Sequence, residues 1–347
     1  MLPNPADFRS DTVTRPTPAM LQAMMAARVG DDVYGEDETV TALEQKLAKL
    51  FGIEAGLFCP SGTMTNQIAI KCFTKPMDEV ICDQTAHVYR YEGGGIAYHS
   101  MASVRLLHGP RGILSPELIA AEINEDNIHY PVSSLVVLEN TVNKGGGACY
   151  TLAQIAPIAA LCKERGLKLH LDGARLFNAL TATGDAAADY GQYFDGISIC
   201  LSKGLGAPVG SVLLGSADTI RKATKLRKVF GGGMRQSGFL AAAGIYALDH
   251  HVLRLAQDHR HAQLLADALE RSAFVAEVMP VQTNIVIFRV TAAYTAAAVI
   301  SSLHEQGVWC AATGPDTVRL VTHLDISPEM ISHTLTVIGR LCPSKTA

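Results

Sequence analysis

The sequence predicts an α/β protein with a large domain, whose mostly parallel sheet is covered by helices on both faces, and a smaller C-terminal α+β domain. Between residues 55 and 214, short apolar runs alternate with segments of helical periodicity. The apolar runs are nearly continuous, which is typical of parallel strands buried on both faces. We therefore expect an N-terminal arm over residues 1–17, a large domain over 18–238, and a connecting helix with the small domain over 239–347.

The first predicted helices precede the alternating region. Residues 7–18 are polar and punctuated by proline, and indicate an extended arm. Pro18 begins a helix that runs to Ala27, because proline is tolerated at the first helical position. Apolar residues at helical spacing predict a second helix over 39–51, and Gly52 ends it.

The alternating region supplies the large sheet. The predicted strands cover residues 55–59, 79–82, 104–107, 134–138, 168–171, 196–201 and 209–214. The predicted helices between them cover residues 62–73, 153–165 and 174–182. Because helices connect most of the strands, the strands are expected to run parallel.

The pattern changes after residue 217. A helix to residue 230 leads into a glycine-rich loop over 231–238, and one long helix is predicted over 239–271, with its histidines on a solvated face. The small domain then follows as a strand over 284–290, a helix over 295–305, a strand over 318–322 and a helix over 328–341.

Composition excludes several classes of protein. The 347 residues are 48% hydrophobic, so a large core is feasible and disorder is not expected. The net charge of −4 argues against a nucleic-acid binder or a protein of anionic membranes, whose surfaces are basic. No apolar stretch approaches the roughly 18 residues of a membrane span.

Cysteine usage indicates a reduced compartment. No C-x-x-C pair is present, and several of the eight cysteines lie in apolar runs, so we expect neither a disulfide framework nor a metal site. The first residues carry no signal-peptide pattern, and a cytoplasmic location is expected. The cysteines are Cys59, Cys72, Cys82, Cys149, Cys162, Cys200, Cys310 and Cys342.

Polar residues follow the predicted strands of the large sheet. In such sheets, ligands bind outside the carboxyl ends of the strands. This rule selects residues 60–63, Glu139, Asn140, Asp172 and the pair at 202–203 as neighbours in one crevice. The sequence therefore predicts a single site at this edge of the sheet.

Lys203 is the centre of this predicted site. It follows a buried strand and is flanked by glycines, so it is either a turn lysine or a desolvated amine that can attack a carbonyl and form a Schiff base. Gly62 and Thr63 begin a helix, where free N–H groups cap the helix or bind a phosphate. Asp172 is either a helix cap or the partner of a protonated pyridine nitrogen.

Three further residues have two interpretations each. Arg319 lies in an apolar strand, so its guanidinium either forms an internal salt bridge or holds a substrate carboxylate. His87 either caps and packs or stacks on a planar ring. Tyr34 lies in an acidic loop that is either solvated or faces a substrate. The sequence has no serine-hydrolase elbow, zinc-protease motif or dinucleotide fingerprint.

Seven segments together resemble the low-specificity L-threonine aldolases, which are pyridoxal-phosphate enzymes of fold type I. The resemblance covers nearly the whole chain. The segments are residues 7–16 (DFRSDTVTRP), 29–35 (VGDDVYG), 138–141 (LENT), 170–175 (HLDGAR), 200–206 (CLSKGLG), 231–238 (GGGMRQSG) and 319–325 (RLVTHLD). The chain departs from many relatives at Val142, where they carry histidine, and in the lysine–glycine run at 144–147.

The resemblance implies a role for each matching residue. Lys203 matches the Schiff-base lysine, Asp172 the partner of the pyridine nitrogen, and Arg175 the residue near the ring hydroxyl. The remaining matches are Gly62 and Thr63 at the phosphate, Lys228 and Arg235 reaching the phosphate region from a neighbouring subunit, Ser10 and Arg319 at the carboxylate, Tyr34 lining the site, His87 on the ring and His129 near the substrate side chain.

The resemblance also implies an activity and an assembly. The expected reaction is reversible cleavage of L-threonine and L-allo-threonine to glycine and acetaldehyde, with pyridoxal 5'-phosphate as cofactor and no metal. His87, His129 and a bound water are the alternatives for the base that takes the β-hydroxyl proton. A homotetramer with sites shared between subunits is expected. The alternatives are a β-eliminating lyase on the same fold and a catalytically silent scaffold.

Overall fold

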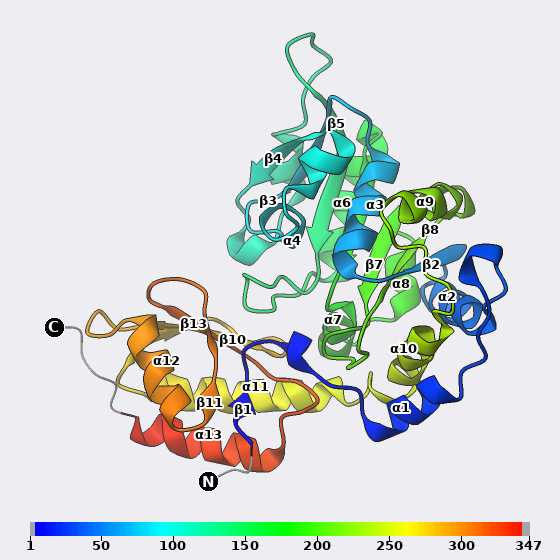
Figure 1. The fold of residues 1–347 in the computed structure, drawn as a ribbon. Helices are drawn as coiled ribbons and strands as arrows, with labels where there is room; N and C mark the ends of the chain where they lie inside the picture. The colour runs from blue at the N-terminus through cyan, green and yellow to red at the C-terminus, as the bar shows by residue number, and fades with distance from the viewer. Residues whose placement is uncertain (1–3, 342–347) are drawn as a thin grey trace.

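A seven-stranded sheet forms the centre of the larger part of the molecule, as the computed structural model of residues 4–341 shows (Figure 1). Six strands run in one direction, and β8 alone runs antiparallel to them. The α/β prediction is confirmed. The strands in spatial order are β2 (Ala55–Cys59), β8 (Ser211–Gly215), β7 (Gly196–Cys200), β6 (Lys168–Gly173), β5 (Val132–Glu139), β3 (Asp78–Asp83) and β4 (Ser103–Leu107).

Helices cover both faces of this sheet. Successive strand residues point to opposite faces, so Val136 and Leu138 of β5 join one apolar cluster and Leu135 and Val137 join another. The first face packs against α2 (Glu38–Phe51), α6 (Leu152–Arg165) and α10 (Gly238–His250). The second face packs against α3 (Gly62–Phe73) and α9 (Ala217–Val229). The strands are therefore buried on both sides.

The helix α2 illustrates how the sequence sets the bounds of an element. Its Val40, Leu43 and Leu47 recur at helical spacing and are buried. The Asp37 side chain caps the N-terminus by accepting the Val40 N–H at 3.0 Å. Gly52 ends the helix in the left-handed conformation, at a φ of 64°.

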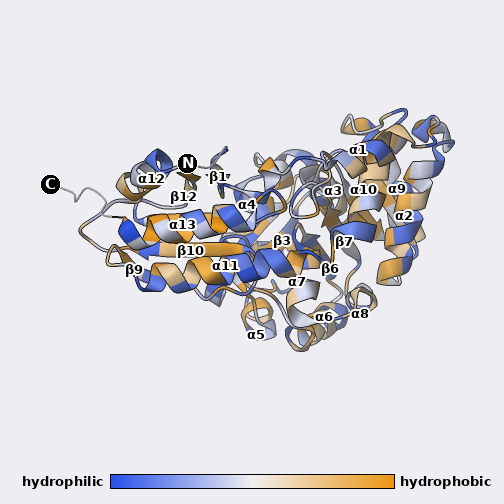
Figure 2. Ribbon diagram, turned by 90° about the horizontal axis from the view of Figure 1, so that it is seen from below, coloured by the Kyte–Doolittle hydropathy of each residue, from blue (hydrophilic) through white to orange (hydrophobic). Residues whose placement is uncertain are grey.

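The small domain is an antiparallel sheet with helices packed against it. Its strand order is β12 (Ala311–Ala312), β13 (Thr317–Val321), β10 (Ile285–Val290) and β9 (Val275–Val278). Its helices are α11 (Leu255–Glu270), α12 (Ala296–Glu305) and α13 (Pro328–Arg340). Figure 2 shows β10 as an apolar strand between α11 and α13, and the side chains of these elements share one core.

The N-terminal arm packs against the small domain. Its strand β1 (Ala6–Asp7) pairs in parallel with β11 (Val308–Trp309). A 3-10 turn, η1 (Asp11–Val13), then leads towards the large sheet. The remaining short elements are α1 (Pro18–Met25), the 3-10 turn η2 (Asp32–Tyr34), α4 (His87–Arg90), a π-helical turn η3 (Ile96–Ser100), a 3-10 turn η4 (Pro110–Gly112), α5 (Pro116–Ala120), α7 (Leu176–Thr183) and α8 (Ala187–Gly191).

The prediction of one long helix over residues 239–271 is wrong. The chain turns at residues 251–254 and forms α10 and α11 instead. The cause is tertiary packing, because α10 belongs to the large-domain core whereas most buried residues of α11 belong to the small-domain core. The expected solvated face is also wrong in part. His251 and His261 are buried, and His251 Nδ1 lies 2.7 Å from the Leu205 carbonyl oxygen.

No helix within residues 4–341 is both long enough and apolar enough to cross a membrane. Cys342 lies outside these residues. The other seven cysteines carry free thiols, and six of them are buried.

A half-buried glutamate on α2, Glu44, predicts how stability depends on pH. Burial raises the pKa of Glu44 to about 7, although its Oε1 accepts the Phe58 N–H at 2.7 Å. The folded state therefore binds this proton more tightly than the unfolded state, whose pKa is near 4.5. The resulting stabilisation is complete below pH 4.5 and is lost as the pH rises to about 7.

We expect Glu44→Gln, which keeps the acceptor for Phe58 but does not titrate, to gain stability relative to the wild type between pH 5 and pH 8, by up to about 3 kcal/mol. Thermal midpoints of both proteins at the two pH values measure this gain. Glu38→Gln, at an exposed position on the same helix, is the control and should show no such change. A difference between wild type and Glu44→Gln that is the same at both pH values would contradict the assignment.

Candidate active site

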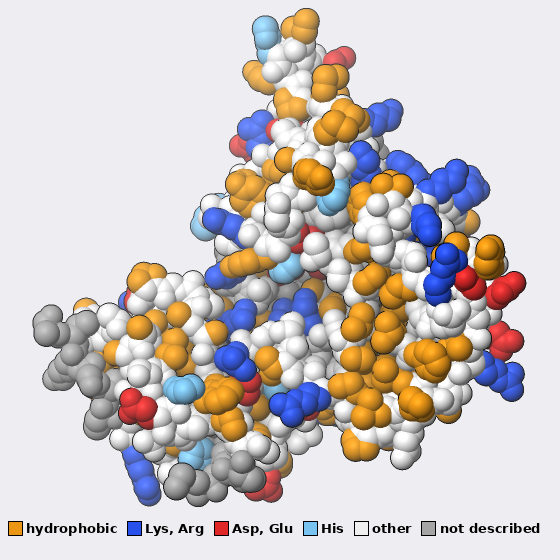
Figure 3. Space-filling model, viewed as in Figure 1, with side chains coloured by type: hydrophobic (Ala, Val, Ile, Leu, Met, Phe, Trp, Pro, Cys, Tyr) orange, Lys and Arg blue, Asp and Glu red, His pale blue; other side chains and the backbone are white. Residues whose placement is uncertain are grey.

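One cavity lies at the carboxyl ends of β2, β6 and β7, where the topology rule places it. Its volume is about 160 Å³. It is lined by Gly62, Thr63, Asn66, His87, Asp172, Ala174, Ser198, Cys200, Ser202 and Lys203. Figure 3 shows charged and histidine side chains around the hollow between the large and small parts of the molecule. Six of the residues selected from the sequence therefore meet here, whereas the other strand-end residues selected, Pro60, Ser61, Glu139 and Asn140, do not line the cavity.

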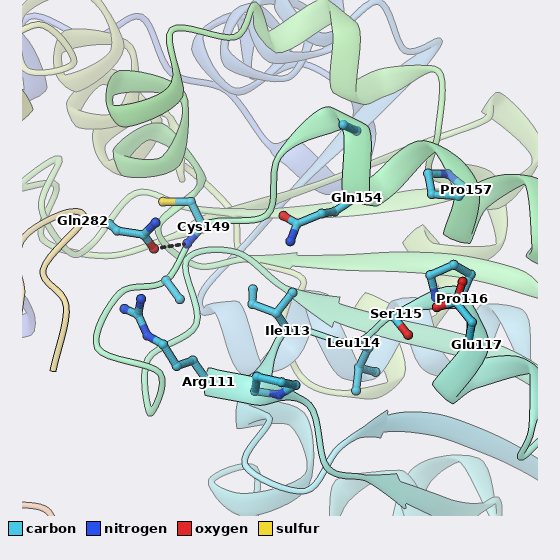
Figure 4. A pocket seen from close by; sticks show the side chains of 13 residues that line it. Arg111, Ile113, Leu114, Ser115, Pro116, Glu117, Cys149, Gln154, Pro157 and Gln282 are labelled. Carbon is cyan, nitrogen blue, oxygen red and sulfur yellow. Dashed lines mark hydrogen bonds between the residues drawn. The ribbon is translucent and has the colours of Figure 1, made fainter.

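A larger hollow, of about 620 Å³, lies elsewhere, between η4, the start of α6 and the small domain (Figure 4). Arg111, Cys149, Gln154 and Gln282 point towards it, and Gln282 accepts the Cys149 N–H at 3.1 Å. None of its lining residues was predicted from the sequence to carry chemistry. The larger hollow therefore contains none of the predicted catalytic or binding residues. We take the smaller cavity, which contains Lys203 and Asp172, as the candidate site.

The start of α3 forms one wall of the cavity and suits an anion. Gly62 and Thr63 are the first two helical residues, so their N–H groups have no acceptor within the helix. The Ser61 side chain caps the helix by accepting the Met64 N–H at 3.2 Å. A Cβ at position 62 would approach Ser211 Oγ to 3.3 Å, so this wall is tight. The positive end of the helix dipole adds to the attraction for a phosphate.

Asp172 lines the cavity and carries one unpaired carboxylate oxygen. It ends β6, is 2% exposed, and its Oδ1 accepts the Ala174 N–H at 3.1 Å. Its Oδ2 is buried without a hydrogen-bond partner among the described residues. A buried carboxylate oxygen without a donor is costly. Asp172 is therefore a local cap on one oxygen and an open acceptor for a cationic N–H group on the other.

Lys203 lies after β7 in a tight turn. The Gly206 N–H donates to the Lys203 carbonyl at 2.8 Å, and Thr14 Oγ1 of the N-terminal arm donates to the same oxygen at 3.1 Å. Gly206 has a φ of 78°, a conformation that favours glycine, so the turn requires a glycine at this position. The backbone of Lys203 is thus fixed from two sides. Within residues 4–341, its amino group has no hydrogen bond or ion pair.

His87 is held by two buried glutamates. Its N–H donates to Glu139 Oε2 at 2.8 Å, and its Nδ1 lies 2.9 Å from Glu92 Oε1. Burial lowers the pKa of His87, but the hydrogen bond to Glu92 and the charges of Asp172 and Glu92 outweigh this and raise it above its ordinary value. The His87, Glu92 and Asp172 ligand atoms lie within 4.8 Å of one another, which is also the spacing of a metal site.

The free oxygen of Asp172 and the anion-binding start of α3 are better explained by an organic phosphate with a protonated ring nitrogen than by a metal.

Arg319 lies on β13 of the small domain and is not among the residues that line the cavity. Its Nη1 donates to Asn143 Oδ1 at 2.9 Å, and its Nη2 donates to the Arg9 carbonyl at 3.1 Å, beside Ser10. Its Nε is buried without a partner among the described residues. Only part of the donor capacity of the guanidinium is used. The described residues form no salt bridge with Arg319, so it remains available for an anion.

Arg175 is buried in a bidentate pair with Asp11. Both N–H···O distances are 2.7 Å, and the guanidinium is 5% exposed. Asn284 of the small domain also donates to Asp11, at 3.3 Å. The arm, the large sheet and the small domain are therefore joined at Asp11.

Three predicted residues form a second group that does not line the cavity. Tyr34 is 75% exposed in the loop that precedes α2. This loop binds the glycine-rich loop through the Asp31–Arg235 ion pair at 2.8 Å and the buried Asp32–Arg227 ion pair at 2.7 Å. Lys228 lies at the end of α9, beside this second loop. Tyr34, Lys228 and Arg235 therefore share one exposed face.

His129 also lies outside the cavity. It belongs to the segment between α5 and β5, which projects from the top of the molecule in Figure 1. Its N–H donates to Asn127 Oδ1 at 3.0 Å within the same segment. The neighbouring Ile128 is 96% exposed. The chain thus does not bring His129 to its own Lys203.

Sequence reasoning missed four residues that hold the site together. They are Asp11, Glu92, Asn143 and, in its structural role, Glu139. Glu139 accepts N–H groups from both His87 and Asn143, and Asn143 in turn holds Arg319. Burial, followed by the charge of Asp172, raises the pKa of Glu139 to about 7. Glu139 could have been recognised as an acid at the end of an apolar strand. Asp11 could have been recognised because it lies in the arm segment 7–16 that carries the family resemblance.

Comparisons with known proteins agree with this geometry. The family model described as beta-eliminating lyase matches residues 7–293. The chain is 45% identical over 327 residues to the low specificity L-threonine aldolase of Escherichia coli K12, covering 94% of this chain and 96% of that protein. It is 43% identical over 292 residues to the enzyme of that name from Saccharomyces cerevisiae, covering 83% and 74%.

A solved structure of Leishmania major threonine aldolase has the same fold. It superimposes with a TM-score of 0.85 over 97% of this chain and 99% of that one, at 24% identity.

Proposed function

Because the chain belongs to the beta-eliminating lyase family and, within it, to the low-specificity L-threonine aldolases, we propose that it cleaves L-threonine and L-allo-threonine reversibly to glycine and acetaldehyde. The enzyme is an aldehyde-lyase that uses pyridoxal 5'-phosphate. The observation that carries the proposal is the meeting of Lys203, Asp172 and the start of α3 in one cavity. These three supply an amine, an unpaired carboxylate oxygen and free N–H groups.

The residues of the cavity fit this cofactor. When bound, pyridoxal phosphate supplies an aldehyde for an amino group and a ring that accepts the electron pair of a broken bond at Cα. The N–H groups of Gly62 and Thr63 would hold the phosphate, and Asp172 Oδ2 would accept the N–H of the pyridine ring. Lys203 would bind the aldehyde carbon. His87 would lie against the ring, and Arg175 would lie near its hydroxyl group.

Two residues outside the lining of the cavity suit an amino-acid substrate. Arg319 and Ser10 would hold the carboxylate, because the guanidinium has unused donors and the hydroxyl lies on the adjacent arm. Cleavage of Cα–Cβ also requires a base at the β-hydroxyl group. His87 is the one of the two candidate histidines that lines the cavity of its own chain. We assign this base to His87 Nε2, acting directly or through a water molecule.

The reaction itself can be tested with purified protein and cofactor. We expect acetaldehyde and glycine from L-threonine and L-allo-threonine, and no acetaldehyde from the D-forms. Release of pyruvate and ammonia from L-serine or L-tyrosine, without aldehyde formation, would identify a β-eliminating lyase instead. A colourless protein that binds no cofactor would identify a silent scaffold.

Arg319→Ala predicts a binding defect. We expect KM for L-threonine to rise about 100-fold, because a charged hydrogen-bonding clamp is lost, while the visible band of the bound cofactor stays. Steady-state kinetics and absorbance measure the two effects. Arg289→Ala is a matched control in the same sheet, where an exposed arginine pairs with Glu277. An unchanged KM in Arg319→Ala would remove Arg319 from the substrate site.

We also propose a homotetramer with sites shared between subunits. The exposed group of Tyr34, Lys228 and Arg235 would reach the phosphate region of a neighbouring subunit, and the projecting segment with His129 would reach the substrate end of another site. Exposed apolar side chains near the first group support an interface: Leu21, Met25, Val33, Val229 and Phe239. Light scattering of the purified protein tests the oligomeric state, and a monomer with full activity would refute a shared site.

A further inference from the structure

Glu92 lies beside His87 at the edge of the cavity, and the family resemblance gives it no role. Its side chain is fully buried. Three nitrogen atoms surround it: Asn66 Nδ2 lies 2.9 Å and His87 Nδ1 2.9 Å from Oε1, and Gln67 Nε2 lies 2.6 Å from Oε2. The two amides come from α3, which also carries the predicted phosphate cradle.

Two amide donors, one on each oxygen of Glu92, favour a group that accepts on both oxygens. An ionised carboxylate accepts on both oxygens, whereas an amide would turn an N–H group towards one of the donors. The contact with His87 must then be a hydrogen bond in which Nδ1–H donates. Nδ1 is therefore the protonated nitrogen, and Nε2 is the nitrogen left for another partner.

The backbone of His87 is fixed independently. Its N–H donates to Glu139 Oε2, so the start of α4 is tied to the end of β5. The ring, however, is tied only through Nδ1, and it remains 30% exposed towards the cavity. The charged groups facing it are Glu92, Glu139 and Asp172 on one side and Lys203 on the other, with the Tyr91 ring 5.5 Å away. Among these, Glu92 alone is bonded to the ring.

We propose that Glu92 is a positioning residue: it fixes the proton of His87 on Nδ1, holds the ring across the cavity, and presents Nε2 to the substrate. This inference rests on the proposed function, because the cofactor against which His87 is held comes from that function. Asn66 and Gln67 orient the carboxylate in turn. Asn66 also lies 3.0 Å from His170 Nε2, two residues before Asp172 on β6, so one polar chain links the residue facing the ring to the strand that carries its nitrogen partner.

A double-mutant cycle on cofactor affinity tests the proposal. Apo-protein is titrated with pyridoxal 5'-phosphate for the wild type, Glu92→Gln, His87→Phe and the double variant. Phenylalanine keeps a flat ring but has no Nδ1. If Glu92 acts through His87, each single variant raises Kd about 10-fold, and the double variant is no weaker than His87→Phe within about twofold.

The opposite result of the cycle would contradict the proposal. If the two effects multiply, Glu92 acts on the fold rather than on His87, and the proposal is wrong. Glu79→Gln is the matched control, since Glu79 is a buried carboxylate bonded to Arg105 and Asn124 and does not line the cavity. It should leave Kd unchanged.

A second variant and a kinetic measurement distinguish failure of this proposal from failure of the proposed function. If Glu92→Gln does not fold, the same cycle uses Glu92→Asp, which keeps two acceptor oxygens but is one methylene too short for His87. Steady-state kinetics should show a fall in kcat at nearly constant KM, because the substrate carboxylate is held by Arg319. If the wild type forms acetaldehyde but the effects of the two substitutions on Kd multiply, this inference alone is refuted. A wild type that binds no cofactor refutes the proposed function as well.

Discussion

Replacing Lys203 with alanine is expected to remove the visible absorbance of the lysine-bound cofactor and to lower turnover by roughly 10⁴-fold to 10⁶-fold, the scale on which loss of a covalent catalytic group acts. The amine lies at the carboxyl end of β7 with its backbone carbonyl held by Gly206 and Thr14, and it has no competing partner within the described chain. It is therefore free for a carbonyl carbon. Absorbance and an acetaldehyde assay measure the two losses.

Two controls separate chemistry from charge and from the number of lysines. Lys203→Arg keeps the positive charge beside Asp11 but should lose the band as completely as the alanine variant. Lys225→Ala, at an exposed position on α9, should change nothing. A visible band that persists in Lys203→Ala would place the cofactor on another lysine.

Replacing Asp172 with asparagine is expected to have two opposite effects. Turnover should fall about 1,000-fold, because an amide no longer stabilises a protonated ring nitrogen and the ring becomes a weaker electron acceptor. The cofactor-free protein should become more stable, because the buried and unpaired Oδ2 no longer carries charge. Kinetics and the thermal midpoint of the apo-protein measure the two effects.

Asp185→Asn is the matched control for the second effect. Asp185 Oδ2 is also buried without a partner, but this residue does not line the cavity. The variant should therefore be stabilised without any loss of turnover. Near-normal turnover in Asp172→Asn would remove Asp172 from the ring nitrogen.

The position of the site followed from the order of strands along the chain. Lys203 and Asp172 each follow an apolar run with strand character, and parallel strands bring their carboxyl ends to one edge. The start of α3 was predicted in the same way, from an apolar run, a serine and a glycine. Each of these features depends on residues close together in the sequence, so the local pattern of apolar and polar residues is enough to predict it.

The contacts that hold the site together could not be predicted in this way. Asp11 and Arg175 are 164 positions apart, and Asn143 and Arg319 are 176 apart. Such pairs depend on how the arm and the small domain pack, which no local periodicity encodes. The break between α10 and α11 has the same origin, because neither glycine nor proline interrupts residues 251–254 and the two helices pack into different cores.

Reducing the holoprotein with borohydride, digesting it and locating the phosphopyridoxyl group by mass spectrometry tests the central claim most directly. That claim is that the cavity at the carboxyl ends of β2, β6 and β7 is the active site of this aldolase. We expect the label on Lys203 and on no other lysine. A label on Lys228 or any other lysine, or no label in a protein that still forms acetaldehyde, would contradict it.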